Sequence, residues 1–375
     1  MYPFFSFGYI NYGGYMSNSK RYNIFIFISS FARNLIEVFS AVFLYKKGFT
    51  LKEIMLFYSV YYFVSVFVNI LTILISRVVS SKYILIISSM VYAFCFYYLS
   101  VMNCSLGNLM IFSVLFAVGC FTYHPLRHKY GIISCRKNLQ KQIGSIVIIT
   151  YLALTPSSLI GGYISEKYGL LFMTAVLFVI SIIGIIPLLK FKDDMEEDSD
   201  FDIKSISKNR IFFFVLEQFK VVFVTLVPLY LFLNIKSDIL YLGVINLFIC
   251  LSAVIFIYIF IKRDVFKYFP YLNIIFCIIL ILKLNISSRI FMLVISFMEG
   301  FFLKMYEVCS TKNMYMVSGD ISKYLIFVEI IFCSTRGFIF LAGYLFNNLT
   351  ILLYVCIFFV FISGFLLKKN TERLV

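Results

Sequence analysis

Nine charged side chains lie inside long apolar segments of this 375-residue sequence. One charge at the middle of a membrane-spanning helix costs about 2.5–3.5 kcal/mol on insertion scales. We therefore expect most of the nine to face a polar cavity, a partner charge or a helix interface rather than lipid. Charges in such places line substrate or ion pathways or join helices. They are Arg33, Glu37, Glu217, Lys220, Glu299, Lys304, Glu307, Glu329 and Arg336.

The spacing of these charges predicts which of them share a helix face, since each residue turns a helix by about 100°. Arg33 and Glu37 are four residues apart, and Glu217 and Lys220 are three apart. Each pair is expected to meet on one face. There it either forms an ion pair that holds helices together or contacts a substrate.

The remaining five charges lie in two segments near the C-terminal end. Glu299, Lys304 and Glu307 fit within an arc of about 140° on one helix. Glu329 and Arg336 are seven residues apart, which is two turns along one face. Both sets predict a polar stripe on an otherwise apolar helix.

Carboxyl groups held in an apolar setting can take up and release protons. Glu37, Glu299 and Glu329 lie deepest in their segments, so they are the candidates for proton handling. Glu217 and Glu307 lie nearer the segment ends, where a long side chain can reach the membrane interface.

The composition indicates what kind of element positions these charges. The sequence is 62% hydrophobic and 14% charged, with a mean hydropathy of +0.97. A soluble domain is about 45–50% apolar and about 25% charged, so the composition excludes a water-soluble enzyme. Twelve helices of about 20 apolar residues each would use most of the hydrophobic positions. Little chain remains for a soluble domain.

Apolar length and loop breaks predict an all-α polytopic membrane protein with twelve spans. The two long connections are the basic segment 127–140 and the charged segment 190–209. The spans are expected at 22–45, 53–76, 82–101, 108–126, 141–163, 170–189, 210–233, 239–261, 268–283, 289–309, 323–346 and 350–367.

The distribution of basic residues predicts the orientation of the chain. With both termini inside, 22 of the 33 Lys and Arg lie in inner segments and 7, including Lys283, in outer ones. Basic residues concentrate in cytoplasmic loops, so both termini are expected in the cytoplasm of a cell-membrane protein. The net charge of +15 then has a membrane explanation and does not indicate nucleic-acid binding.

The charged segment divides the spans into two sets of six. We expect two pseudo-symmetric six-helix bundles, since a shift of 181 residues aligns Gly119 with Gly300 and Gly162 with Gly343. The first 21 residues carry an uncharged aromatic stretch, and translation can begin at Met1 or Met16. The expected parts are an N-terminal tail at 1–21, a bundle at 22–189, a cytoplasmic linker at 190–209, a bundle at 210–367 and a cytoplasmic tail at 368–375.

Small residues and proline mark expected sites of close helix packing. Gly119, Gly300 and Gly343 are interpreted as packing positions because small residues let helices approach closely. Pro156 lies inside an expected span, where it frees a carbonyl and permits a bend. Gly161 and Gly162 follow it and extend the small-residue strip.

Neither cofactor nor metal binding is expected. The two histidines, His124 and His128, cannot form a zinc site unaided, and the nine cysteines contain no CxxC pair. Most of these cysteines lie in apolar runs, where they serve as small hydrophobic side chains.

This pattern resembles the major facilitator superfamily (MFS) over nearly the whole chain. Twelve spans in two halves, a charged linker, and charges on spans one, seven and ten carry the resemblance. Local matches are 45–54, similar to the family's first outer turn with a capping Thr, and Gly161-Gly162-Tyr163 at the end of span five. The segment 119–125 resembles the inner end of span four in the efflux branch. The resemblance implies that spans one, four, seven and ten line a central cavity between two rocking bundles.

The signature motifs of that family are degraded here. The stretch between spans two and three keeps basic character only at Arg77 and Lys82, and Ser76 stands where the family has an Asp. That Asp helps latch the two halves in the family. In span five, four residues separate Pro156 from Gly161, where the antiporter signature has two.

The resemblance and the buried charges together predict a secondary transporter and not an enzyme. We expect proton-coupled export of a small, partly apolar molecule by alternating access, performed by a monomer in the lipid bilayer. One alternative is a non-transporting relative that acts as an immunity, sensor or assembly protein. A membrane-embedded transferase is a further alternative, but such enzymes usually need substantial loops that carry the reacting groups.

Overall fold

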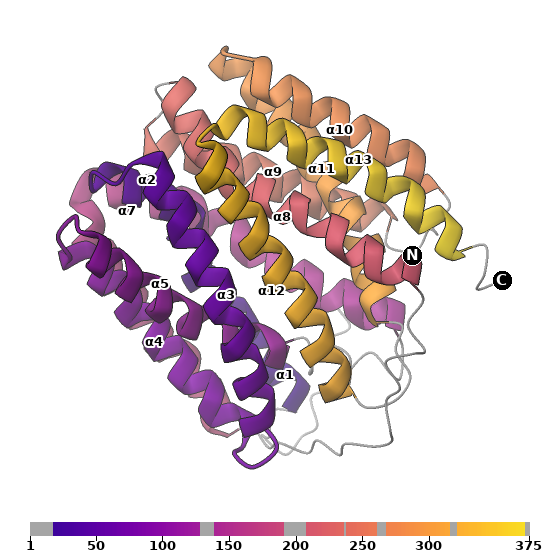
Figure 1. The fold of residues 1–375 in the computed structure, drawn as a ribbon. Helices are drawn as coiled ribbons and strands as arrows, with labels where there is room; N and C mark the ends of the chain where they lie inside the picture. The colour runs from indigo at the N-terminus through magenta and orange to yellow at the C-terminus, as the bar shows by residue number, and fades with distance from the viewer. Residues whose placement is uncertain are drawn as a thin grey trace.

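The computed structural model describes residues 18–127, 139–190, 208–235, 238–260, 268–315 and 321–371. In these ranges the chain folds into long apolar helices with short connections (Figure 1). Its elements are α1 (Asn18–Asn34), η1 (Glu37–Phe39), α2 (Ser40–Lys46), α3 (Leu51–Ile75), α4 (Ser81–Val101), α5 (Leu106–Phe121), α7 (Leu139–Leu189), α8 (Lys208–Asn234), α9 (Ile239–Phe260), α10 (Phe269–Asn285), α11 (Arg289–Tyr315), α12 (Ile321–Phe346) and α13 (Leu349–Thr371).

The all-helical membrane architecture expected from composition is confirmed. Among the described residues, nine helical segments are long and apolar enough to cross a membrane, and α10 is a shorter apolar helix. The exact number of twelve spans and the division into two six-helix bundles stay predictions. Most of the expected linker lies outside the described residues.

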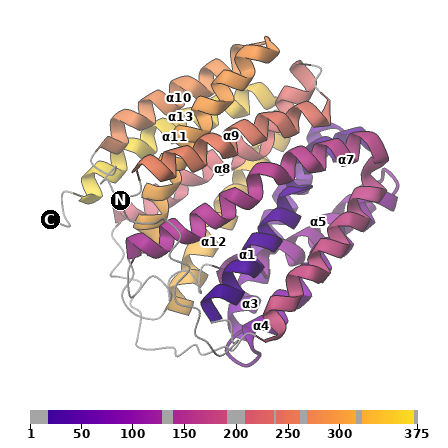
Figure 2. The same cartoon turned by 180° about the vertical axis from the view of Figure 1, so that it is seen from behind.

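Helix α7 covers two expected spans, 141–163 and 170–189. Its apolar part, Ile148–Leu189, has 42 residues, which a straight helix would extend to about 63 Å, twice the hydrocarbon thickness. Gly169 interrupts it with a φ of 83° and a ψ of 168°, a conformation that glycine adopts without a Cβ clash. The helix therefore turns back at Gly169, as Figure 2 shows.

The first expected span, 22–45, lies within one apolar segment long enough to cross a membrane, Lys20–Lys46, but its backbone is not one uninterrupted helix. Helix α1 ends at Asn34, the 3₁₀ turn η1 occupies 37–39, and α2 begins at Ser40. At the break, the carbonyl oxygen of Leu35 lies against Gly161 of α7, where any Cβ would clash. Irregular backbone at membrane depth is tolerated where it is buried in protein or lines a cavity.

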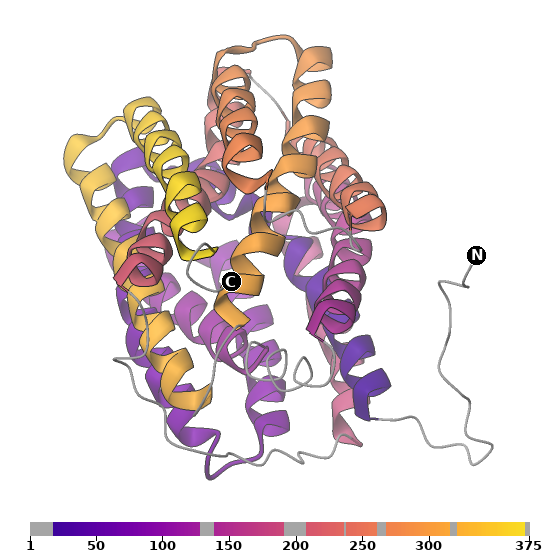
Figure 3. The ribbon, with the colours of Figure 1, turned by 90° about the vertical axis from the view of Figure 1, so that its right-hand side faces the viewer.

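Local sequence signals set the helix ends. Thr50 caps α3 as expected: its side chain accepts from Glu53 N, and the Glu53 carboxylate accepts from Thr50 N at 2.8 Å. This reciprocal capping box satisfies two free backbone donors. Pro270 stands in the first turn of α10, where its missing N–H costs nothing. Residues 286–288 then join α10 to α11 at the top of Figure 3.

We call the described helices up to residue 190 the first group and those from residue 208 onward the second group; two extensive contacts join them, and α2 makes a smaller contact with α8. In the first group α7 packs on α1 and α4, and α5 packs on α3 and α4; in the second, α13 packs on α8 and α10, and α11 packs on α9 and α10. The groups meet where α3 lies along α12 (Figure 1) and where α7 lies along α9 (Figure 2). We call these the α3–α12 contact and the α7–α9 contact.

Candidate functional site

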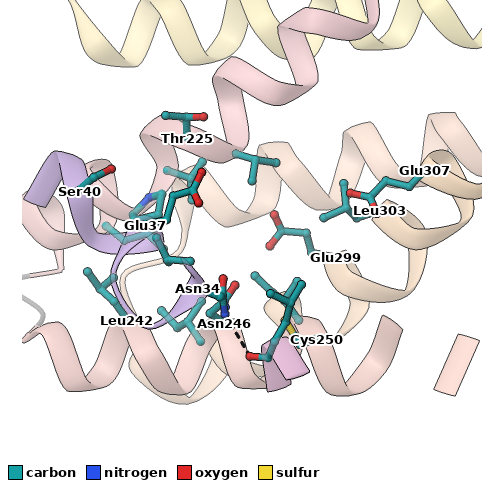
Figure 4. A pocket seen from close by; sticks show the side chains of 18 of the residues that line it. Asn34, Glu37, Ser40, Thr225, Leu242, Asn246, Cys250, Glu299, Leu303 and Glu307 are labelled. Carbon is teal, nitrogen blue, oxygen red and sulfur yellow. Dashed lines mark hydrogen bonds between the residues drawn. The ribbon is translucent and has the colours of Figure 1, made fainter. Parts of the chain in front are cut away.

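A cavity of about 480 Å³ lies between the two groups of helices. The first group contributes residues of α1, η1, α2, α3, α5 and α7, and the second contributes residues of α8, α9, α10 and α11. Figure 4 shows this cavity and the side chains that line it. A pocket shared by two groups of helices changes shape whenever the groups move relative to each other.

Glu37 lines the cavity at the break in the first span. It is the first residue of η1, and its carboxylate accepts a hydrogen bond from Tyr92 Oη at 3.3 Å. The same hydroxyl lies 3.2 Å from the carbonyl oxygen of Arg33, which it can bond in turn. Figure 4 shows the carboxyl groups of Glu37 and Glu299 on opposite sides of the cavity. Glu37 therefore reaches the cavity from the irregular segment between α1 and α2.

Neutral polar and aromatic groups complete the wall beside Glu37. Tyr58, Tyr61 and Tyr62 of α3 line the cavity, and Tyr61 stacks on Phe116 with ring centroids 4.8 Å apart. Asn246 of α9 also lines it, and its buried Nδ2 makes no hydrogen bond within the described residues. The wall therefore offers aromatic faces and at least one unused donor to a ligand.

Lys283 is a cavity residue that the sequence analysis placed in an outer loop, and that placement is wrong. It lies in α10 with an exposed fraction of 1%, and its ammonium forms an ion pair with Glu299 of α11. Both residues line the cavity. The sequence analysis missed this because Lys283 is the last residue of an expected span, where the long side chain of a lysine normally reaches the membrane interface. A carboxylate on the neighbouring helix holds it inside instead.

Lys304 and Glu307 form an ion pair on α11, on the C-terminal side of Glu299. The Lys304 ammonium lies 2.8 Å from the Glu307 carboxylate, as the predicted shared face requires. Tyr151 of α7 donates to the same carboxylate at 2.7 Å, and its ring lies 3.9 Å from the ammonium. Glu307 and Tyr151 line the cavity. This pair is therefore a polar connection between the two groups of helices.

Glu217 and Lys220 are buried on α8, as the three-residue spacing suggested. Their charged groups are 3.5 Å apart, and Glu217 also accepts from the Ser310 hydroxyl of α11. The Lys220 ammonium lies 4.8 Å from the centre of the Tyr306 ring. Neither residue lines the cavity, so this pair joins α8 to α11 within the second group.

The direct contacts of Arg33 are with neutral groups, and it attracts Glu37 only through space. Its guanidinium donates to Gly119 O at 3.0 Å and to Ser88 Oγ at 3.2 Å. It also lies between the rings of Tyr92 and Tyr123, with 4.2 Å to each centroid. The helix break after Asn34 is the reason, because helical spacing no longer sets the position of Glu37 relative to Arg33.

Glu329 and Arg336 lie on α12 outside the cavity lining and contact different partners. Glu329 accepts from Asn69 Nδ2 of α3 at 3.2 Å, whereas Arg336 donates to Gln218 of α8 at 2.8 Å. Of the nine predicted charges, the structure therefore brings Glu37, Glu299 and Glu307 to the cavity. The other six lie behind it or at helix contacts.

The predicted packing residues lie at helix contacts of several kinds. A Cβ on Gly119 would meet the Tyr92 backbone at 2.8 Å, and one on Gly162 would meet Ile239 O at 2.9 Å. Arg77 is exposed in the turn after α3, and Pro156 lies within α7 near Gly161. Gly300 faces the backbone of α9, and Gly343 faces the side chains of Leu352 and Met55.

The arrangement is suited to binding and proton transfer. The cavity carries three carboxylates and one ammonium among aromatic and amide groups. Within the described ranges, no cluster of three His, Cys, Asp or Glu side chains is placed to hold a metal ion. The chemistry available in the cavity is hydrogen bonding, charge pairing and aromatic contact.

Comparisons with known proteins identify the fold. No protein-family model and no curated protein sequence matches the chain. The human organic anion transporter MFSD10 (TETRAN) aligns with a TM-score of 0.68 at 9% identity, over 93% of this chain and 98% of that one. The nucleoside transporter NupG aligns with a TM-score of 0.66 at 11% identity, over 94% and 99%. A point mutant of NupG gives a TM-score of 0.68 at 10% identity, over 94% of this chain and 99% of that one. The chain therefore shares the fold of these solved transporters.

Proposed function

We propose that this chain is a secondary transporter that exports a small, partly apolar molecule across the cell membrane and is driven by protons. The observation that carries the proposal is the cavity with Glu37 and Glu299 on opposite sides, built jointly by the two groups of helices. An organic anion transporter and a nucleoside transporter share the fold. Small-molecule transport is therefore the activity that best fits a binding cavity in this position.

Alternating access would proceed by rocking of the two groups about the cavity. Where α2 meets α8, side chains of the two groups are in contact: the rings of Tyr45 and Phe232 lie 6.3 Å apart, and the Lys46 ammonium lies 5.7 Å from the Phe232 centroid. Separation of these side chains would open the cavity there. The Tyr151–Glu307 hydrogen bond is the corresponding connection on the α11 side.

Glu37 is the proposed proton carrier of the cavity. Its neighbour Glu299 is already paired with Lys283, whereas Glu37 contacts a neutral hydroxyl. Arg33 and Arg127 attract the Glu37 carboxylate through space, but its hydrogen-bond donor is neutral. This carboxylate can therefore bind either a proton or a cationic group of the substrate. Competition between the two at one carboxylate would couple proton entry to substrate release.

Both termini are proposed to lie in the cytoplasm, which places the connection between α4 and α5 outside. Cys104 is in that connection and is exposed, whereas the other described cysteines are buried. A membrane-impermeant maleimide should therefore label intact cells at Cys104. Labelling of Cys104 only after the membrane is permeabilised would indicate the opposite orientation of the chain.

Reconstituted protein tests the proposed transport. Purified wild-type chain is first screened for thermal stabilisation by a panel of organic cations, organic anions and nucleosides. A compound that stabilises it is then followed in proteoliposomes, by exchange across the membrane and by uphill movement driven by a pH gradient. We expect Glu37→Gln to retain exchange and to lose at least tenfold of the gradient-driven rate, because glutamine cannot carry a proton.

Glu53→Gln is the matched control, since Gln also completes a capping box and Glu53 lies outside the cavity lining. Full gradient-driven transport by Glu37→Gln would remove Glu37 from the proton pathway. Binding without any exchange in the wild type would favour the non-transporting sensor or assembly role.

A further inference from the structure

We propose that Glu329 and Asn69 form a proton-binding site inside the α3–α12 contact, separate from the central cavity. Its coupling to transport rests on the proposed function, whereas its occupancy by a proton does not. The two residues come from different groups of helices, with Asn69 on α3 and Glu329 on α12. Neither of them lines the cavity.

Both side chains are withdrawn from solvent and lipid. Glu329 has an exposed fraction of 3% and Asn69 of 0%. Asn69 Nδ2 donates to Glu329 Oε2 at 3.2 Å and also lies 3.3 Å from Cys333 Sγ. The Cys333 thiol lies 3.9 Å from the same carboxyl oxygen. A compact polar cluster of three side chains is thus enclosed between two apolar helices.

The carboxyl group of Glu329 has no close cation within the described part of the chain. The basic residue two turns along the same face of α12 is Arg336, which turns to Gln218 of α8 at 2.8 Å and lies 5.4 Å from the Tyr62 ring of α3. The charges of α8 are engaged elsewhere, since Glu217 and Lys220 pair with each other. Arg336 attracts an ionised Glu329 only at longer range, because its guanidinium donates to Gln218 instead. Burial of an ionised Glu329 without a direct ion pair is therefore still costly.

The amide of Asn69 has an unused acceptor. Its Oδ1 is buried and has no hydrogen-bond partner within the described residues. A carboxylate offers acceptors only, whereas a carboxylic acid adds one O–H donor. Binding of one proton from water to the Glu329 carboxylate creates a hydroxyl beside an amide that lacks a donor. The cluster is therefore completed by the acid form.

The position of the site links its proton to movement of the helices. Further along the α3–α12 contact, Ser59 Oγ donates to Gly337 O at 3.1 Å and the rings of Tyr58 and Phe340 stack 4.8 Å apart. Rocking of the two groups must slide or bend this contact and would alter the enclosure of Glu329. A proton bound more tightly in one conformation than in the other shifts the balance between them.

Infrared spectroscopy of the full-length protein in lipid nanodiscs tests the site without any substrate. The wild type is expected to show the carbonyl band of a protonated carboxylic acid that titrates with pH and shifts in D₂O. Glu329→Gln should remove a component of this band that Glu37→Gln and Glu299→Gln retain. Asn69→Ala should keep that component and move its frequency, because the acid loses its amide partner.

Two results would overturn the site. One is an acid band unchanged in Glu329→Gln, and the other is a wild-type spectrum without any acid band as the pH is lowered. If Glu329→Gln fails to fold, Asn69→Ala still tests the site. An acid carbonyl band at the wild-type frequency in Asn69→Ala would also exclude it. A wild-type protein that shows the Glu329 acid band but no transport would contradict the proposed function and leave the proton-binding site standing.

Discussion

Two buried cations, Arg33 in the first group of helices and Lys283 in the second, are accommodated in opposite ways. Arg33 is 7% exposed and contacts a carbonyl, a serine hydroxyl and two tyrosine rings. Lys283 is 1% exposed and pairs directly with the carboxylate of Glu299. One cation is held by neutral partners and the other by an opposite charge.

The difference follows from the shapes of the two cationic groups. A guanidinium is planar and weakly hydrated, so aromatic faces and backbone carbonyls can satisfy it. An ammonium is a compact, strongly hydrated charge that needs an anion when it is buried. Arg33 therefore forms no direct ion pair with Glu37, whose carboxylate can bind a ligand in the cavity, whereas the carboxylate of Glu299 is already paired with Lys283.

Removing the buried ammonium is expected to have the largest effect. Lys283→Met leaves the Glu299 carboxylate buried without its partner, which should destabilise the fold by about 3–5 kcal/mol. The double variant Lys283→Met, Glu299→Gln carries no such charge and should recover most of that loss. Thermal unfolding of the purified proteins measures both, and a double variant no more stable than the single one would contradict the pair.

Filling the helix break should have a smaller effect. A Cβ on Gly161 clashes with the Leu35 carbonyl oxygen, and overpacking of this kind costs about 1–3 kcal/mol. Gly161→Ala should therefore lower the unfolding temperature, whereas Gly107→Ala should not, because nothing lies within 4 Å of the position that its Cβ would take. Equal stability of the two variants would show that the close approach is not needed to hold the break.

Exchanging the cation type at Arg33 should have the smallest effect. Arg33→Lys keeps the charge but loses the planar stacking between Tyr92 and Tyr123, a loss of about 1 kcal/mol. The ammonium is also expected to draw Glu37 toward it and to weaken gradient-driven transport. Unfolding temperature and transport rate are measured together, and an unchanged transport rate would show that Glu37 is independent of Arg33.

Local patterns in the sequence predicted the elements reliably because they depend on near neighbours. Thr50 caps its helix as the resemblance implied, with Glu53 completing a capping box, and the three-residue spacings at 217–220 and 304–307 both give ion pairs. Each of these outcomes needs only helical geometry within one turn. The resemblance to the MFS likewise predicted the fold that the solved transporters share.

The partners of the buried charges were beyond such patterns. Asn69 carries no charge and gives no signal in an apolar run, yet it is the amide that bonds Glu329 from another helix. Tyr151 was one of 28 tyrosines, and only its contact with Glu307 sets it apart. Partners on other helices follow no spacing rule.

Composition and helical spacing were enough to predict an apolar, all-helical membrane protein with charges too costly to face lipid. Tertiary structure decided which charges meet a cavity, where the first span breaks and why Lys283 is buried. The physical reason is the distance along the chain over which each effect acts. Burial of apolar surface and helical periodicity act along the chain, whereas the position of a charge in a low-dielectric interior depends on the groups that other helices bring within a few ångströms.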